Sequence, residues 1–325
     1  MDFPQNEQLR YDGTIHPLVA SLPHHHNVPR DREENRLWRL RVLEKAARDK
    51  AFRKVLLDAC AEDFLFFVNG FCVLTEPRVG EEIQGLSPFV TWVHQEPVMA
   101  AMQFYAGRRH MVCDKSRAQG ASWIAVAFFV WMFLFHPHAI LGMGSKDEET
   151  ADEPTNPDSL GWKIDFTITH LPKWMRPPGV ELGGPNRKKS DHTWTNVLNG
   201  STIKAYSATA GIGRGGRFTC FFLDESAFYL PGKDTEAVSN LLKTTNSLMM
   251  FSTPNGVNNE HHARVTNPGR WLLCILDWKD NPWQRRGLYT VTDGKLVYLD
   301  KDFVHPDNYQ FVLDGRVRSP WYDAR

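Results

Sequence analysis

Four short apolar segments, each ending in polar residues, constrain the fold of this chain more than any other feature of its sequence. They cover residues 110–114, 139–145, 218–225 and 247–256, and longer stretches of chain separate them. Continuous apolar segments of this length are typical of strands buried on both faces, which occur in parallel sheets covered by helices. The sequence therefore predicts an α/β fold with a mainly parallel central sheet flanked by helices.

Helical and hairpin patterns surround these segments. Residues 32–69 repeat apolar side chains at intervals of three and four, which predicts one or two amphipathic helices packed on the core. The apolar run 123–135 is too short to span a bilayer, so we interpret it as a buried helix. The dipeptides Asn199-Gly200 and Asp293-Gly294 lie between β-rich runs and predict two hairpins.

The composition along the chain suggests three parts. Residues 1–30 are polar and rich in Pro and His, and we expect a flexible N-terminal arm there. Residues 31–270 hold the predicted helices and strands of the core. Residues 271–325 include the late hairpin and are expected to form a small C-terminal lid or linker subdomain.

Overall composition narrows the functional classes only slightly. The formal net charge is +0, so a contact with DNA would have to come from a local patch or from another part of an assembly. The 5 cysteines form no C-x-x-C pair, which favours reduced intracellular thiols, and the first residues are not a signal peptide. Three histidines at 24–26 lack further ligands at a suitable spacing and are interpreted as a solvated loop.

The stretch CDKSRAQGASW has the outline of a phosphate-binding loop without a lysine at the usual place. In the frame G-x-x-x-x-G-K-[ST], Gly120 and Ser122 take the second glycine and the hydroxyl, whereas Ala121 takes the lysine position and Lys115 the first glycine. Backbone N–H groups of such a loop cradle phosphate, and the cation need only reach it. Both Lys115 and Arg117 can do so, and a plain strand–turn–helix connection is the competing interpretation.

Two adjacent carboxylates, Asp224 and Glu225, end the third apolar segment. Carboxylates at the edge of a core are costly unless a cation or a hydrogen-bond network binds them. Neighbouring strand residues point to opposite faces, so Asp224 could hold Mg²⁺ through water while Glu225 orients and deprotonates an attacking water. The competing interpretation is a helix N-cap. The loop upstream favours the catalytic interpretation.

Taken in order along the chain, KSRAQGAS, FFLDESAF and FSTPNG resemble the ATPase motor of the large terminase subunits of tailed bacteriophages. Further segments with the same resemblance are WVHQEPVMAAM upstream of the loop, NGSTIKAYSATAGIGRGGRF before the acidic strand, and LDWKDNPW near the end of the motor. Together they cover about residues 85–285. The resemblance implies a P-loop NTPase of the additional-strand catalytic-glutamate type.

The resemblance also implies roles for individual residues. Gln95 would bind adenine, and the phosphate cradle would consist of Lys115, Ser116, Arg117, Ala118, Gln119, Gly120, Ala121 and Ser122. Ser122 and Asp224 would hold Mg²⁺, and Glu225 would be the catalytic base. A coupling segment that senses the γ-phosphate would consist of Ser252, Thr253, Pro254 and Asn255. Arg214, in the glycine-rich stretch GIGRGGRF, would complete the site of a neighbouring subunit.

The activity implied is Mg²⁺-dependent ATP hydrolysis that powers translocation of viral double-stranded DNA into the procapsid. The implied partners are that DNA, the portal protein, the terminase small subunit and further copies in a ring, with no membrane. The implied location is the host cytoplasm, transiently at the procapsid portal.

Members of this family carry a C-terminal nuclease domain with a carboxylate cluster. Asp300, Asp302, Asp307 and Asp314 are scattered in a loop-like stretch and do not predict that cluster, so endonuclease activity is expected to be absent. Two alternatives stay open. A helicase-like, nucleic-acid-dependent ATPase shares the upstream glutamine, the loop and the acidic pair, and a non-catalytic scaffold would have an inactive nucleotide site.

Overall fold

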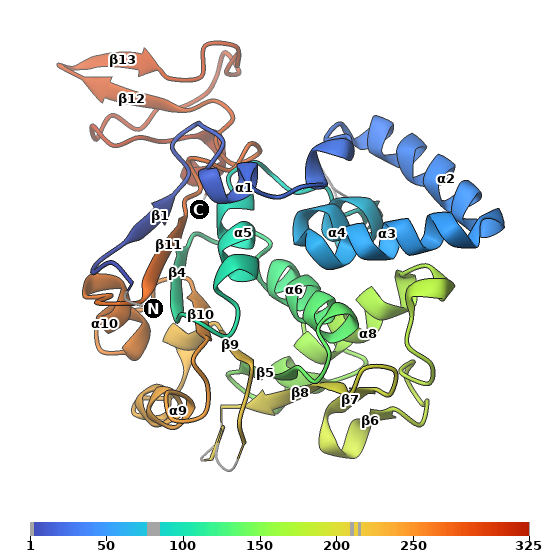
Figure 1. The fold of residues 1–325 in the computed structure, drawn as a ribbon. Coiled ribbons are helices and arrows are strands. Elements are labelled where there is room, and N and C mark those ends of the chain that lie inside the picture. Colours follow the sequence, from blue (N-terminus) through green and yellow to red (C-terminus); the bar gives the residue numbers. More distant parts are fainter. Residues whose placement is uncertain (1–2, 77–84, 209–210, 214–215, 325) are drawn as a thin grey trace.

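One large sheet forms the centre of the molecule (Figure 1). Within the residues that the computed structural model describes, 3–76, 85–208, 211–213 and 216–324, this sheet has nine strands in the order β1-β11-β4-β10-β9-β5-β8-β7-β6. The strands are β1 Gln8–Arg10, β4 Met111–Lys115, β5 Ile140–Ser145, β6 Arg187–Lys188, β7 Thr193–Asn196, β8 Ser201–Ser207, β9 Cys220–Asp224, β10 Leu248–Ser252 and β11 Leu272–Leu276. All neighbours are parallel except that β7 is antiparallel to β6 and β8. The predicted mainly parallel sheet is confirmed.

The four apolar segments that the sequence analysis emphasised become β4, β5, β9 and β10. Strand β10 lies between β4, which leads into the loop, and β9, which leads into the acidic pair. This inserted strand is the additional strand for which one class of P-loop NTPases is named. The order of the strands therefore agrees with the predicted class.

Helices cover both faces of the sheet. They are α1 Pro17–Ala20, α2 Arg32–Arg48, α3 Lys50–Glu62, α4 Phe64–Phe71, α5 Glu96–Tyr105, α6 Ala121–Phe135, α7 Glu148–Asp152, α8 Leu160–His170, α9 Lys233–Leu241, α10 Glu260–Thr266 and α11 Pro320–Asp323. In Figure 1, α9 and α10 lie on one side of the sheet and α4, α5, α6 and α8 on the other. Two separate hydrophobic clusters, one with the side chains of α4 to α6 and one with those of α9, correspond to these two layers.

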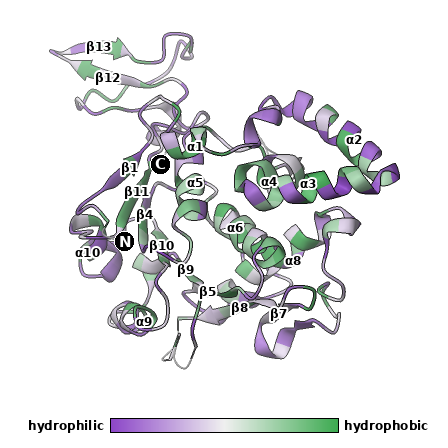
Figure 2. Ribbon diagram, in the orientation of Figure 1, coloured by the Kyte–Doolittle hydropathy of each residue, from purple (hydrophilic) through white to green (hydrophobic). Residues whose placement is uncertain are grey.

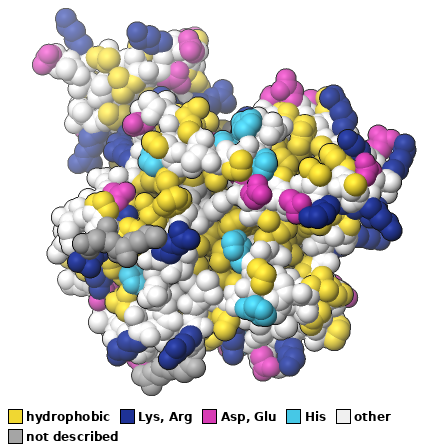
Figure 3. All heavy atoms as spheres, viewed as in Figure 1, with side chains coloured by type: hydrophobic (Ala, Val, Ile, Leu, Met, Phe, Trp, Pro, Cys, Tyr) yellow, Lys and Arg dark blue, Asp and Glu magenta, His cyan; other side chains and the backbone are white. Residues whose placement is uncertain are grey.

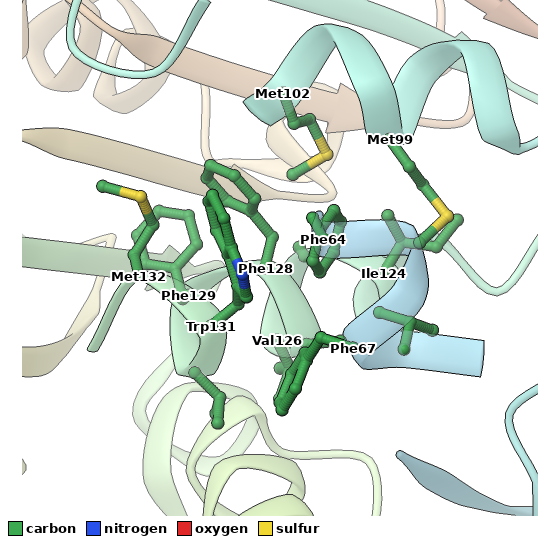
Figure 4. Packing of buried hydrophobic residues seen from close by; sticks show 14 of the residues in the cluster. Phe64, Phe67, Met99, Met102, Ile124, Val126, Phe128, Phe129, Trp131 and Met132 are labelled. Atoms are coloured by element: carbon green, nitrogen blue, oxygen red, sulfur yellow. The ribbon is translucent and has the colours of Figure 1, made fainter. Parts of the chain in front are cut away.

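Helix α6 is the centre of the larger hydrophobic cluster. It is apolar nearly all round and is coloured green along its length in Figure 2, because α4, α5 and α8 surround it. Figure 4 shows Phe64 of α4 against Phe128 and Trp131 of α6, with ring centroids 5.4 and 5.6 Å apart. The indole N–H of Trp131 donates to the carbonyl of Cys60 at 2.6 Å, so the buried polar atom is satisfied. This packing fixes the position of the helix that begins at the loop.

Both predicted hairpins are present. The Asn199-Gly200 turn joins β7 to β8, which pair antiparallel, and Gly200 has a φ of 73°. A separate two-stranded sheet joins β12 Tyr289–Thr292 to β13 Lys295–Tyr298, with φ values of 52° for Asp293 and 72° for Gly294. Two residues of positive φ are what a type I′ turn requires. A second small sheet pairs β2 Val73–Glu76 with β3 Gly85–Pro88.

The two ends of the chain differ from the predicted division. Residues 8–10, expected in a flexible arm, form β1 and pair in parallel with β11. Strand β11 itself, expected outside the core, pairs with β4 inside the central sheet. The polar composition of residues 1–30 concealed the first of these, because an edge strand with one neighbour needs few apolar side chains. The core therefore extends to residue 276.

Other expectations concern membranes, cysteines and histidines. Among the described residues, no helix is long and apolar enough to cross a membrane. All five cysteines are buried and unpaired, in agreement with the predicted free thiols. The backbone N–H groups of His24 and His25 donate to the carboxylate of Asp63, the N-cap of α4, at 2.9 and 2.7 Å, while His26 is exposed.

The outer surface is mixed in character. Figure 3 shows Lys, Arg, Asp and Glu side chains bordering α2 and α3, with hydrophobic side chains between them. Leu37 and Leu40 of α2 and Val55 of α3 are 44%, 65% and 61% exposed.

Candidate nucleotide site

The three polar motifs meet because their strands are neighbours. Strands β4, β10 and β9 are adjacent and parallel, so their carboxyl ends lie at one edge of the sheet. In this register Ser252 pairs with Asp114, the residue before Lys115, and Phe251 pairs with Asp224. Ligands of open α/β sheets bind outside the carboxyl ends of the strands. The structure therefore brings the loop, the acidic pair and the coupling segment together at one edge of the sheet.

The loop between β4 and α6 has the backbone of an anion-binding turn. Ala118 and Gly120 have φ values of 57° and 68°, and Gly120 directly precedes α6. The left-handed backbone of Gly120 is the reason for glycine there. The N–H groups at the first turn of a helix have no partner within the helix, and the helix dipole favours negative charge there. The loop can therefore bind phosphate through its backbone.

Lys115 is bound to the carboxylate of the acidic pair. Its ammonium nitrogen lies 2.7 Å from Oε1 of Glu225, and the lysine is 7% exposed. Burial alone would raise the pKa of Glu225, but the charge of Lys115 and the hydrogen bonds that the carboxylate accepts outweigh it and lower this pKa. The loop thus brings a cation directly to the predicted base.

The coupling segment contacts the other oxygen of the same carboxylate. Oε2 of Glu225 accepts hydrogen bonds from the Ser252 hydroxyl at 3.1 Å, the Thr253 N–H at 3.2 Å and the Thr253 hydroxyl at 3.3 Å. Asn255 donates to the carbonyl of Ala227 at 3.0 Å. Pro254, between Thr253 and Asn255, is exposed. Glu225 has a φ of 47°, a conformation that non-glycine residues hold only where their surroundings enforce it. Glu225, directly after β9, is therefore positioned by residues at the ends of β4 and β10.

Asp224 and Ser122 form the candidate metal site. The Ser122 hydroxyl donates to Oδ2 of Asp224 at 2.8 Å, while Oδ1 is buried and has no partner among the described residues. Burial raises the pKa of Asp224, which Lys115 partly opposes. A hydroxyl and a carboxylate are oxygen ligands of the kind that Mg²⁺ prefers, and its remaining positions are commonly taken by water and phosphate. The residues present therefore fit Mg²⁺, and Oδ1 is the atom that it would satisfy.

Gln95 is held between two backbone groups. Its side chain accepts from the Trp92 N–H at 2.9 Å and donates to the carbonyl of Gln119 in the loop at 2.8 Å. Next to it, Nε2 of His94 lies 2.9 Å from Oε1 of Gln119. Burial lowers the pKa of His94 to about 4, so its imidazole is neutral at pH 7.

Residues after β11 hold the loop from the other side. Gln284 donates to the carbonyl of Arg117 at 2.9 Å and accepts from Gln119 at 2.8 Å. The Ser116 hydroxyl accepts from the Trp278 N–H at 3.0 Å. The segment LDWKDNPW had been noted only for its resemblance, and its contact with the loop could not be read from periodicity.

A cavity of about 650 Å³ joins these groups. It lies at the carboxyl ends of the strands. Its lining includes Gln95, Asp224, Glu225 and Thr253, together with all residues of the loop 115–122 other than Ser116. Aromatic rings of Trp92, Trp123 and Trp283 also line it. A cavity of this size, lined by aromatic rings together with many polar and charged side chains, can hold a small polar molecule.

Two residues differ from the rest of the candidate site: one predicted residue cannot be placed, and one lining residue was not predicted. Arg214, the predicted contact to a neighbouring subunit, lies outside the described residues. Lys163 of α8 lines the cavity and is 7% exposed, yet the sequence analysis did not select it. A signal existed, since this lone lysine occupies a position of the apolar stripe formed by Leu160, Ile164, Thr167 and Ile168.

Comparison with known proteins gives related folds and no family. No family model matches the chain. Similar solved structures include the large terminase of bacteriophage HK97, at 13% identity and a TM-score of 0.43, over 66% of this chain and 43% of that one. An ATPase-domain mutant of the Thermus phage P74-26 large terminase is similar at 15% identity and a TM-score of 0.42, over 58% and 84% of the two chains. A large terminase from a thermophilic bacteriophage in complex with ADP is similar at 17% identity and a TM-score of 0.33, over 52% and 40%.

The strand order, the loop and the acidic pair define an α/β fold with a mainly parallel central sheet, in agreement with the P-loop NTPase class that the sequence predicts. The solved structures to which the chain is similar are phage large terminases, and the chain spans less than half the length of the HK97 protein.

Proposed function

We propose that this chain is an ATPase of the viral DNA-packaging type, which hydrolyses ATP to move double-stranded DNA into a procapsid. The observation that carries the proposal is the setting of Glu225, whose carboxylate is bound by Lys115 of the loop and by Ser252 and Thr253 of the neighbouring strand. A base that contacts both the phosphate loop and a coupling segment can link hydrolysis of the γ-phosphate to movement of the DNA.

In the proposed reaction, Glu225 takes a proton from a water molecule while the water oxygen bonds to the γ-phosphorus. The bond from that phosphorus to the β,γ-bridging oxygen breaks, and its electrons stay with ADP. Gln95 would contact the adenine, and the loop 115–122 would hold the phosphates. Ser122 and Asp224 would hold Mg²⁺, which supplies charge neutralisation to the phosphates when bound. Lys115 and Arg117 are the loop cations within reach.

We also propose roles for the residues after β11 and for Arg214, and we propose the partners of the chain. Residues after β11, which include Gln284 and Asn281, would act as a lid on the loop. Arg214 would act on the nucleotide of a neighbouring copy in a ring. The double-stranded DNA, the portal protein and the terminase small subunit are the proposed partners, and the host cytoplasm at the procapsid portal is the proposed place of action.

Two measurements test the proposal. The first is release of phosphate from ATP with and without Mg²⁺, with Glu225→Gln as the inactive control. The second is packaging of double-stranded DNA into empty procapsids, with protection from nuclease as the readout. Hydrolysis without packaging, but stimulated by single-stranded nucleic acid, would favour a helicase-like ATPase. Absence of both nucleotide binding and hydrolysis would favour a scaffold.

A further inference from the structure

Lys163 is a buried cation at the candidate nucleotide site that the proposed mechanism does not use. It lies on α8, which packs against α6, and its side chain lines the same cavity as Lys115, Ser122 and Asp224. The lysine is only 7% exposed. A buried ammonium is costly unless something compensates for the loss of water around it. The groups that surround the Lys163 ammonium therefore indicate whether its charge needs a further partner.

The compensation that Lys163 has is small. Its ammonium donates to the backbone carbonyl of Asp158 at 2.6 Å and lies 5.8 Å from the centre of the Trp123 ring. No carboxylate among the described residues forms an ion pair with it, although the charge of Asp224 is close enough to act on its titration. Burial lowers the pKa of Lys163, and Asp224 and Asp158 raise it again only in part. An anion in the cavity would supply the missing partner.

The other cations around the cavity are placed differently. Lys115 is neutralised by Glu225 at 2.7 Å. The side chain of Lys146 is 49% exposed and lies 3.9 Å from a carboxylate oxygen of Asp147, and Arg117 is exposed. A polyphosphate keeps negative charge even when a divalent metal is bound. Among the described residues that line the cavity, Lys163 is the buried cation with no carboxylate bound to it.

Packing fixes where this cation lies. The ring of Trp123, one residue after Ser122, is 5.5 Å from the ring of Phe166, and Phe166 stacks on Trp162 beside Lys163. Trp123 is thus shared between the start of α6 and the face of α8 that carries Lys163. These contacts, none of which involves loop residues 115–122, hold the face of α8 that carries Lys163 against the start of α6.

We propose that Lys163 contacts the γ-phosphate of bound ATP and is a second phosphate-binding cation, supplied by α8 rather than by the loop. The inference rests on the proposed function, since it deepens the same site. It predicts that Lys163 distinguishes ATP from ADP. A cation on the γ-phosphate stabilises bound ATP and not bound ADP. A residue that only donates to the carbonyl of Asp158 would affect the binding of both nucleotides equally.

The experiment measures the affinities of fluorescent ribose-labelled ATP and ADP, each with Mg²⁺, for the full chain and its variants. Lys163→Met should weaken ATP binding on the order of 10- to 100-fold, the effect of one charge-assisted hydrogen bond, and should leave ADP binding within about twofold. Lys163→Arg should restore most of the preference for ATP. Lys173→Met, an exposed lysine of the same region, is the matched control and should change neither affinity.

A second variant guards against a failure to fold. Lys163→Gln removes the charge but keeps a donor for the carbonyl of Asp158, and thermal melting monitors each variant. An unchanged ratio of ATP to ADP affinity in Lys163→Gln, or equal losses for both nucleotides in Lys163→Met, would overturn the inference. Loss of the preference for ATP over ADP in Lys163→Gln, together with its retention in Lys163→Arg, would support the inference. If the wild-type chain binds neither nucleotide, the proposed function fails as well, whereas normal binding that Lys163 does not affect removes this inference alone.

Discussion

The ammonium of Lys115 lies 2.7 Å from Oε1 of Glu225, so the first residue of the loop is bound to the carboxylate that directly follows β9. While this pair is intact, the pKa of Glu225 is lowered and its carboxylate is a weaker base. While Lys115 keeps this contact, the loop cation that remains available to a bound phosphate is Arg117, which is exposed.

Glu225→Gln should bind ATP and hydrolyse it slowly. Removal of a general base typically lowers the rate on the order of 10²–10⁴-fold, and the amide keeps the size of the side chain and an acceptor for Ser252 and Thr253. The measurement is phosphate release at saturating ATP, together with the affinity for a fluorescent ATP analogue. Glu44→Gln, on the exposed face of α2, is the control. Near-normal turnover in Glu225→Gln would remove Glu225 from this role.

Arg117→Ala should weaken ATP binding more than Lys115→Ala does. Arg117 is exposed at the cavity and its fork can bridge two phosphate oxygens, whereas the amine of Lys115 is already bound to Glu225. We expect a loss of about tenfold or more for Arg117→Ala, measured by titration with the fluorescent analogue. Arg36→Ala on α2 provides the control. A loss of binding in Lys115→Ala alone would reverse the assignment.

Acidification should destabilise the wild-type chain more than His94→Gln. The pKa of His94 is lowered to about 4 by burial, so the unfolded chain binds a proton at His94 below about pH 6.5 and the folded chain does not until about pH 4. This contribution to stability is full above pH 6.5 and falls as the pH decreases through that window. The difference should reach about 2 kcal/mol at pH 5, measured by chemical unfolding at pH 7.5 and pH 5. Parallel losses in both proteins would contradict the assignment.

Arg187→Met should strongly destabilise the fold without touching the cavity. The guanidinium is buried, lies 2.7 Å from Asp152 and 3.2 Å from Asp165, and stacks on Trp194 at 3.7 Å. Removal of one partner of a buried ion pair leaves an uncompensated charge and typically costs 3–5 kcal/mol, so we expect about that loss. The control is Arg48→Ala, whose exposed pair with Glu44 should contribute about 0.5 kcal/mol or less. Similar unfolding free energies for the two variants would show that the buried pair is unimportant.

Arg214→Ala should bind ATP but stay inactive at every protein concentration. If Arg214 acts on a neighbouring subunit, the wild-type chain should be a poor ATPase when dilute and improve as it self-associates. An arginine of this kind contributes roughly 10³–10⁵ in rate. Mixing Arg214→Ala with Glu225→Gln should restore some activity, because the first keeps its own base and borrows an arginine from the second. No rescue under conditions where the copies assemble, with a rate per subunit independent of concentration, contradicts the role in trans.

The sequence by itself determined the strands, the class of fold and the members of the loop and the acidic pair. Apolar runs and turn dipeptides are local patterns, and each states directly which backbone its own residues favour. Gly120 before a helix and Asp224 after a strand could be located for this reason. The early edge strand β1 could not, because its stability comes from pairing with the distant strand β11, where Arg10 lies opposite Ile275.

Only the tertiary structure decided which of these residues touch. Lys115 and Glu225 are 110 positions apart, and Gln119 and Gln284 are 165 apart. Their contacts exist because β4, β10 and β9 are neighbours in the sheet and because the chain after β11 returns to the loop. The partners of a side chain depend on this order and on burial, neither of which a local pattern contains. Lys163 shows the same limit, since its place in an apolar stripe indicates burial, while the packing of α8 on α6 decides that it faces the cavity.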